Sequence, residues 1–289
     1  MQILVNGLIQ GLLIAVLALG FMSVYLPTRV FFVGLAGVYT VSPFLAWQVR
    51  SAGGPWWLAL VLAGLVSIAL SLACELLNHR RLDRRGASSG AHLISSLGIF
   101  IVVVQVVAMI WGNETKVLRT GIDSIYRMGG VTLTRSQVVG GMVSLVCLLG
   151  YYLWLRFSNL GLRFRALADN PVQLALYGYN TDRLRLIAFG ISGLLAGISG
   201  ILMAYDVGFD PHAGLHAVLL AIVAVIVGGR NSFLAPILGG VLLGVLRAEV
   251  VWYLSARWQE AATFLLVVVV LFLRPQGLLG SRGRLEADT

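Results

Sequence analysis

Charge is scarce in this sequence, and so is cysteine. Of its 289 residues, 11% are Asp, Glu, Lys or Arg, whereas 58% are hydrophobic. Soluble globular domains carry about 25% charged residues, so this composition excludes an ordinary soluble protein. Cys74 and Cys147 are the two cysteines; each lies in an apolar stretch and neither belongs to a CxxC pair. We interpret both as packing residues rather than as parts of a disulfide or metal site.

Motifs for nucleotide binding and catalysis are also lacking. The sequence has no GxxxxGK[ST] segment, so the chain itself is not expected to hold nucleotide phosphates. It has no HExxH segment and its four histidines are scattered, which predicts no metal site. Residues 86–90 match GxSxG, but Ser88 follows arginines in a short loop, whereas a hydrolase needs a strand-to-helix turn there. We therefore expect no catalytic residue, no bound cofactor and no enzymatic activity in this chain.

Long apolar runs dominate what is present. Several approach or exceed the ~20 residues that span the ~30 Å hydrocarbon core of a bilayer. They predict an all-α polytopic membrane protein with about eight to nine transmembrane segments, some interrupted, in one domain over residues 1–289. The first run is expected to be a retained span, because it lacks the basic stretch and cleavage site of a signal peptide. The runs are Ile3–Leu26, Val30–Val49, Trp56–Leu77, Leu93–Trp111, Val138–Leu155, Leu186–Tyr205, Leu215–Val227, Phe233–Leu254 and Ala261–Leu273.

The loops between these runs differ in positive charge. Alternating spans place the arginines of residues 80–85, the 156–185 loop and the C-terminal tail on one side of the membrane. Cytoplasmic loops are enriched in Lys and Arg, so this side is predicted to be the cytoplasm, with the N-terminus outside and the C-terminus inside. The expected location is the bacterial cytoplasmic (inner) membrane. The net charge of +9 is explained by these loops, and no nucleic-acid partner is expected.

Two of the runs differ from the others in length or composition. Leu215–Val227 is too short to cross a bilayer unaided, and Val30–Val49 contains glycines and Pro43 well inside its length. In transporters, short or interrupted segments mark a binding site, because irregular backbone is tolerated where it lines a cavity. The alternative is that both are kinked packing helices. As a hypothesis, the substrate path includes Phe32, Leu35, Thr40, Ser42, His216 and Leu220.

The loop of residues 156–185 is the polar interruption with the most regular pattern. Its segment from Arg165 to Gly178 is predicted to form one short amphipathic helix, with Pro171 near its start and Gly178 at its C-terminal end. A helix that stays outside the lipid between two spans suggests a docking element. The alternative is a solvated helix on the membrane surface. The other long loop, residues 112–137, is interpreted as a solvated outer loop.

Glycines and a few charges lie inside or at the ends of the runs. Glycines four residues apart allow helices to pack closely in a membrane; such pairs are Gly7/Gly11, Gly193/Gly197 and Gly240/Gly244. Glu75 lies at a span's end beside Arg80, and we expect it to be paired or to reach the interface. Arg247 and Glu249 point about 200° apart on a helix, so they are not expected to pair with each other. Each is expected to have its own partner, on this chain or on another subunit.

Three segments resemble the permeases of branched-chain amino acid ABC importers. GLRFRALADNPVQLALYGYNTDRLR (residues 161–185) looks like the family's cytoplasmic coupling loop, and VGGRNSFLAPILGGVLLGVL and RPQGLLG match later family segments in order and spacing. The resemblance implies a second, homologous permease, two ATPase subunits that hydrolyse ATP with Mg²⁺, and an extracytoplasmic solute-binding protein. It also implies ATPase contact through Arg163, Arg165, Ala168, Asp169, Asn170, Pro171, Leu174, Ala175 and Gly178.

The sequence departs from this family at polar positions of the interrupted runs. Leu35 and Leu220 stand where relatives often carry His and Lys, and Arg247 replaces a frequent Glu. ATP-driven import is therefore the firmer expectation, with an aliphatic amino acid as cargo and urea, a short amide or another small organic solute as the alternative. A stand-alone secondary transporter would need ion-coupling groups near the membrane midplane, and few are visible in the sequence.

Overall fold

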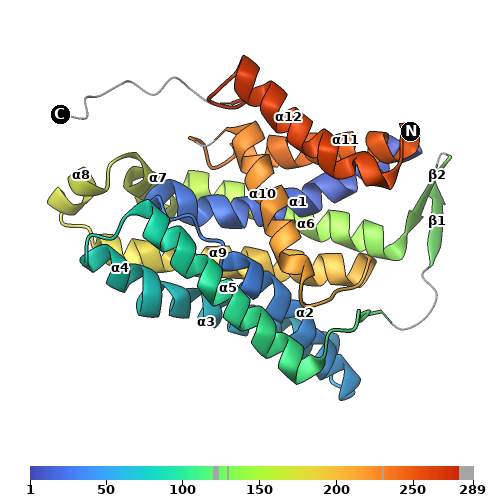
Figure 1. Cartoon of the computed structure of the whole chain (residues 1–289), viewed down its shortest axis with the longest axis horizontal. Helices are drawn as coiled ribbons and strands as arrows, with labels where there is room; N and C mark the ends of the chain where they lie inside the picture. The colour runs from blue at the N-terminus through green and yellow to red at the C-terminus, as the bar shows by residue number, and fades with distance from the viewer. Residues whose placement is uncertain (120–123, 129, 230, 280–289) are drawn as a thin grey trace.

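The molecule is a bundle of helices, most of which run along one long axis (Figure 1). The computed structural model describes residues 1–119, 124–128, 130–229 and 231–279. A π-helical turn, η1 (Glu75–His79), continues α3, and a 3-10 turn, η2 (Ala256–Trp258), precedes α12. The helices are α1 (Gln2–Thr28), α2 (Leu35–Ser51), α3 (Trp56–Cys74), α4 (Arg80–Arg84), α5 (Ser89–Trp111), α6 (Arg135–Phe157), α7 (Asn159–Asp169), α8 (Pro171–Leu176), α9 (Thr181–Asp206), α10 (Ala213–Gly228), α11 (Ala235–Tyr253) and α12 (Gln259–Leu273).

Each predicted apolar run corresponds to one helix, which confirms the all-α polytopic fold. Within the described residues, seven helices are long and apolar enough to cross a membrane, by length and composition. The seventh of these spans, Ala256–Leu273, combines η2 with α12. The two apolar runs outside the seven form α2, with 17 residues, and α10, with 16. At 1.5 Å per residue each measures roughly 25 Å, less than the ~30 Å of hydrocarbon. These are the two runs that the sequence marked as interrupted or short.

Helix α1 forms the centre of the bundle and packs most extensively against α11 and α9. Every apolar side chain from Ala15 to Met22 is at most 2% exposed. The close approach to α11 depends on glycine, because a Cβ added to Gly11 would lie 2.7 Å from the Cα of Val241. A Cβ on Gly193 of α9 would likewise lie 2.7 Å from the Cβ of Ser71 on α3. The glycine pairs therefore do pack helices together, as predicted.

The two ends of the bundle carry different structures (Figure 1). Helices α4, α7 and α8 lie at one end, and the antiparallel hairpin of β1 (Ile125–Met128) and β2 (Val131–Thr134) lies at the other, next to the N-terminus. Gln2 binds the hairpin twice: its Nε2 donates to the carbonyl of Thr132 at 2.7 Å, and its Oε1 accepts from the N–H of Thr132 at 2.6 Å.

The hairpin was not predicted, since residues 112–137 were interpreted as a solvated loop. A signal was present in the sequence, because two short runs with β-branched or aromatic residues, IYRM and VTLT, flank a Gly-Gly pair. The strands have only four residues each; the described side chains of β1 are exposed, and those of β2 are mostly half-buried. Their apolar content is too low to stand out beside the long runs.

Candidate functional site

A cavity of about 540 Å³ lies among α1, α2, α9 and α10, and α11 and α12 close one edge of it. Much of one wall is apolar, with Leu13, Leu17, Met203, Ala217 and Leu220 facing the space. Polar groups stand on the remaining lining: Gln10, Tyr39, Thr40, Asp210, His216, Arg247 and Gln259. The cavity is thus amphipathic, a surface on which an aliphatic body and a polar head can be held together.

Half of the predicted path residues line this cavity, namely Thr40, His216 and Leu220. The two short helices that carry them approach closely, because Gly214 of α10 leaves no room for a side chain against Thr40 and the carbonyl of Ala36. Contact of these three side chains with a solute stays a prediction.

The other predicted path residues are packed between helices rather than exposed to the cavity. The Phe32 ring contacts the rings of His79 and Phe189, with centroids 5.5 and 5.1 Å away. Leu35 is fully buried in the core. Ser42 donates to the carbonyl of Gly197 at 2.8 Å and so joins α2 to α9. The sequence marked the right two helices, but only the fold determines which of their faces meets the cavity.

Arg247 is a cavity residue that the sequence analysis did not select. Its Nη1 donates to Glu260 Oε1 at 3.1 Å and to Thr263 Oγ1 at 3.2 Å, and Glu260 Oε1 is also 3.4 Å from His216 Nε2. This cluster joins α10, α11 and α12 within one chain, so the expectation of a partner on another subunit is not needed for Arg247. The sequence did carry a signal for the Arg247–Glu260 pair, because these opposite charges lie on the two sides of the short connection between α11 and α12.

The loop of residues 156–185 contains two helices, so the prediction of a single helix from Arg165 to Gly178 is wrong. The break falls at Asn170, with φ −152° and ψ 99°, because the residue before a proline avoids the α region. Pro171 is the first residue of α8, and the Asn170 side chain accepts from the N–H of Gln173 at 3.0 Å as an N-cap. Gly178 ends the turn after α8 with φ 81°, as expected.

The predicted docking residues differ in their surroundings. Leu174 is buried with Leu167 and Leu184 in a small cluster that fixes α7 and α8 to α9. The Arg163 guanidinium lies 4.8 Å from the centroid of the Tyr179 ring. Three of the residues, Arg165, Ala168 and Asp169, border a second cavity. Ala175 is exposed, and so are three apolar residues of the same tip that were not selected: Val172, Leu176 and Tyr177.

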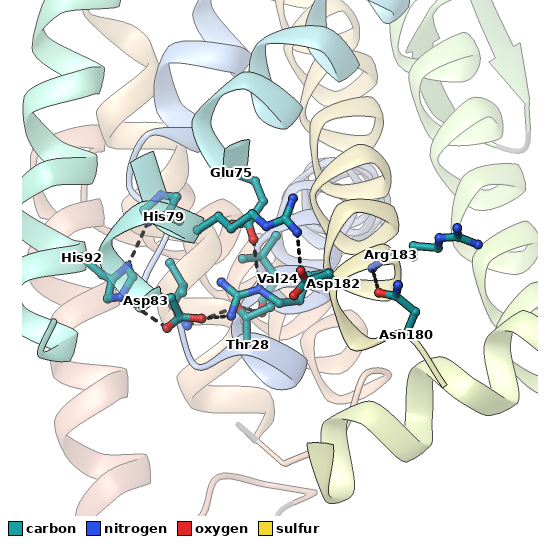
Figure 2. A network of polar contacts seen from close by, with 12 residues as sticks. Val24, Thr28, Glu75, His79, Asp83, His92, Asn180, Asp182 and Arg183 are labelled. Carbon is teal, nitrogen blue, oxygen red and sulfur yellow. Dashed lines mark hydrogen bonds and ion pairs between the residues drawn. The ribbon is translucent and has the colours of Figure 1, made fainter. Parts of the chain in front are cut away.

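A network of charged side chains joins the start of α9 to α3, α4 and α5 (Figure 2). Arg185 pairs with Glu75 and Asp83, and Arg80 pairs with Asp182. The network continues on Asp83: its Oδ1 is 3.7 Å from His92 Nε2, and His92 Nδ1 is 3.2 Å from the Nδ1 of His79.

The pairing of Glu75 differs from what its neighbours in sequence suggested. Its ion-pair partner is Arg185, 110 residues away, rather than Arg80 of the following helical turn, which pairs with Asp182. The Glu75–His79 π-turn places both Glu75 and His79 in the core, each at most 1% exposed. The loop that carries α7 and α8 is therefore held to the membrane helices by buried charges as well as by its leucines.

A bundle of apolar helices around an amphipathic cavity, with a helical loop at one end, defines a polytopic membrane protein of the transport class. The model of the family "Branched-chain amino acid transport system / permease component" matches residues 3–273. The chain therefore belongs to this family, and the resemblance expected from the sequence is confirmed.

Two similar relatives are permease proteins of high-affinity branched-chain amino acid transport systems. LivH of Salmonella typhimurium is 27% identical over 294 residues, covering 97% of this chain and 95% of that protein. BraD of Pseudomonas aeruginosa is 28% identical over 295 residues, with the same coverage. Among solved structures, PsaBC from Streptococcus pneumoniae in complex with Fab is similar, with a TM-score of 0.54 and 11% identity over 96% of this chain and 93% of that chain. That likeness concerns the fold alone.

Proposed function

We propose that this chain is a transmembrane permease subunit of an ATP-binding cassette importer and forms part of the path for a branched-chain or other aliphatic amino acid. The observation that carries the proposal is the amphipathic cavity beside α2 and α10 in a chain of this family. Transport needs no covalent chemistry from the permease. The chain supplies a path and a mechanical connection to the subunits that use ATP.

The partners in this proposal are a second, homologous permease, two ATPase subunits and an extracytoplasmic solute-binding protein. The ATPases would bind ATP and Mg²⁺ and would contact α8, where Val172, Leu176 and Tyr177 are 68%, 83% and 81% exposed. Exposed apolar side chains clustered on one short helix favour a protein contact. The ATPases would bind at the cytoplasmic face of the inner membrane. The chain would cross that membrane several times, with the N-terminus outside and the C-terminus inside.

The connection between α8 and the membrane helices supports alternating access. Leu174 fixes α8 to Leu184 on α9, and Arg185 fixes α9 to Glu75 at the end of α3. A displacement of α8 by closing ATPases would therefore move α9 and α3 together. Both helices pack against α2, and α9 also lines the cavity, so this motion would change the access to the cavity.

The cavity favours a solute with both an apolar body and charges. Leu13, Leu17 and Leu220 offer apolar contact, while Asp210 and Arg247 supply charge of both signs. A branched-chain amino acid has an aliphatic side chain, a carboxylate and an ammonium group, which match both parts of the lining. Urea and short amides have little apolar surface and form the alternative cargo. A stand-alone secondary transporter is the alternative of another class.

The test is reconstitution of the chain with and without co-expressed partner ATPases and permease. In proteoliposomes supplied with the binding protein, uptake of radiolabelled leucine should require ATP and all subunits. A panel of solutes, including urea and acetamide, should then compete in the order of their affinity for the binding protein. Leucine uptake by this chain alone, without ATP, would contradict the importer assignment.

A further inference from the structure

A second cavity, of about 890 Å³, lies at the α7 end of the bundle. It is an open pocket bordered by the C-terminal ends of α1 and α6, by α7, and by the segment that leads into α11. Its lining consists of Leu26, Arg29, Tyr152, Leu155, Arg156, Arg165, Ala168, Asp169, Asn231, Ser232, Phe233 and Leu234. No described residue of this lining belongs to the first cavity or to the exposed tip of α8. Three of its residues, Arg165, Ala168 and Asp169, belong to the predicted docking set on α7.

The lining carries an excess of positive charge. Arg29, Arg156 and Arg165 come from three different elements, and Asp169 is the one acidic side chain among the described lining residues. None of the three arginines forms an ion pair with another residue that the structure describes. Arg156 donates to the hydroxyl of Tyr152 at 2.6 Å, which leaves its charge uncompensated. Guanidinium groups that converge without a carboxylate partner favour binding of an anion, above all a phosphate group.

The backbone of Arg29 supports a role for its side chain. Arg29 is the non-glycine residue with positive φ among the described residues, at φ 57° and ψ 15°. Its N–H donates to the carbonyl of Tyr25 at 2.9 Å, so the left-handed conformation ends α1 as a C-cap. Glycine and asparagine are favoured in this conformation, so arginine is not explained by the backbone. Arginine places a positively charged guanidinium on the cavity lining, whereas glycine or asparagine at this position would place no charge there.

An apolar surface begins at the same cavity and extends along the bundle. Leu26, Leu155 and Phe233 form buried apolar parts of the lining. Leu234 also lines it, and Leu238 and Leu242 follow at intervals of four residues on α11, 48% and 36% exposed. Residues four apart lie on one face of a helix. The cavity therefore joins a cationic pocket at the end of the spans to an apolar strip along one of them.

We propose that this cavity binds the headgroup of an anionic phospholipid, with an acyl chain lying along Leu238 and Leu242 of α11. A phosphodiester beside Arg29, Arg156 and Arg165 would neutralise their charge, and basic pockets between membrane helices are known to suit such headgroups. A free phosphate ion would use the arginines but not the apolar strip. Because Arg165 is on α7, a bound lipid would also connect α7 to α1 and α6. Such a lipid would bind whichever solute the first cavity accepts.

The test uses the full chain in nanodiscs of phosphatidylcholine that contain spin-labelled phosphatidylglycerol or, in parallel, spin-labelled phosphatidylcholine. Electron paramagnetic resonance measures the motionally restricted fraction of each label, and their ratio gives the headgroup preference. We expect the wild type to prefer phosphatidylglycerol several-fold, and Arg29→Gln/Arg165→Gln to lose most of that preference. The matched control, Arg84→Gln/Arg85→Gln, removes two exposed arginines from the same end outside the cavity and should keep it.

Two further measurements separate the possible outcomes. Arg29→Lys/Arg165→Lys keeps the charges and should retain more of the preference than the Gln variant. A photoreactive phosphatidylglycerol should cross-link in the wild type to the ends of α1 and α6, to α7 or to the start of α11, which needs no variant to fold. Equal preference in the wild type and the Gln variant, or equal loss in the control, would overturn the proposal. Displacement of the lipid by inorganic phosphate, beyond the effect of ionic strength, would assign the site to a free anion instead.

Discussion

Arg185 Nε donates a hydrogen bond to Glu75 Oε1 at 2.9 Å and thereby joins the beginning of α9 to the π-turn at the end of α3. The two residues are 110 positions apart in the sequence. Glu75 is 1% exposed, so the guanidinium is the charge that compensates its carboxylate in the core. The same arginine also pairs with Asp83, which makes it the centre of the network.

Loss of the Glu75 charge should destabilise the protein. Glu75→Gln leaves a partly buried guanidinium without its inner partner, and breaking a buried pair costs about 3–5 kcal/mol. For a chain of this size that corresponds to a fall in Tm of roughly 10 °C. The measurement is thermal unfolding in detergent, followed by size-exclusion chromatography. Arg81→Gln, an exposed residue of α4, is the control and should change Tm little. Equal Tm values for Glu75→Gln and the wild type would show that the pair contributes no stability.

A charge on the tip of α8 should prevent ATPase coupling without unfolding the chain. Ala175→Glu and Leu176→Glu both change exposed positions, and Leu176 is 83% exposed. We expect each to abolish solute uptake and transport-stimulated ATP hydrolysis while the membrane level stays normal, because a carboxylate would have to be desolvated in an apolar contact. Leu160→Glu makes the same change at an exposed position of α7 and should be tolerated. Normal uptake by both α8 variants would place the ATPase contact elsewhere.

Leu220 offers a direct test of the cavity as a path. Leu220→Lys should impair uptake without preventing assembly, because a lysine within a span costs only ~3 kcal/mol on insertion scales yet would place a charge against the apolar wall. Leu220→Met nearly preserves volume and should be tolerated. Leu219→Lys is the matched control: it puts the same charge at the adjacent, 47% exposed position of α10. Uptake is compared at matched membrane levels, and equal uptake by Leu220→Lys and wild type would remove Leu220 from the path.

The contact of α1 with α11 should tolerate no side chain at Gly11. In Gly11→Ala the new Cβ would lie 2.7 Å from the Cα of Val241, so the helices must separate, at a cost of about 1–3 kcal/mol as in other overpacked cores. Gly98→Ala on α5 meets nothing within 4 Å and should instead raise stability by about 0.5–1 kcal/mol. Thermal unfolding in detergent should therefore shift the two Tm values in opposite directions. Equal shifts would mean that the change of glycine itself, rather than the contact, determines stability.

Orientation in the membrane can be tested with two single cysteines. Ser88→Cys lies at the start of α5, at the end that the arginines predict to be cytoplasmic, and Ser124→Cys lies beside the hairpin at the other end. A membrane-impermeant thiol reagent should label Ser124→Cys in intact cells and Ser88→Cys only after the inner face is opened. Both positions are exposed, so a difference in labelling reports the side of the membrane. Labelling of Ser88→Cys in intact cells would reverse the predicted orientation.

The local hydrophobic pattern of the sequence was sufficient to predict the membrane helices but not the contacts between them. The apolar runs predicted every membrane helix, and the shortness of Leu215–Val227 reappears in the 16 residues of α10. Asn170 shows where pattern was misleading: the apolar spacing continues across Asn170-Pro171, but the proline forces its predecessor out of the helical conformation. A local steric rule, given more weight than periodicity, would have found that break.

The sequence by itself determined that this chain is a helical membrane protein with two unusual segments, because length and hydrophobicity are properties of the chain that need no partner. Only the tertiary structure decided that Thr40 and Leu220 meet a cavity while Leu35 and Ser42 do not, since that depends on how α2 and α10 rotate against α1 and α9. It likewise paired Glu75 with Arg185 rather than with nearby Arg80. Ion pairs in a dry core form between groups that the fold brings within about 4 Å, and distance along the chain does not set that separation.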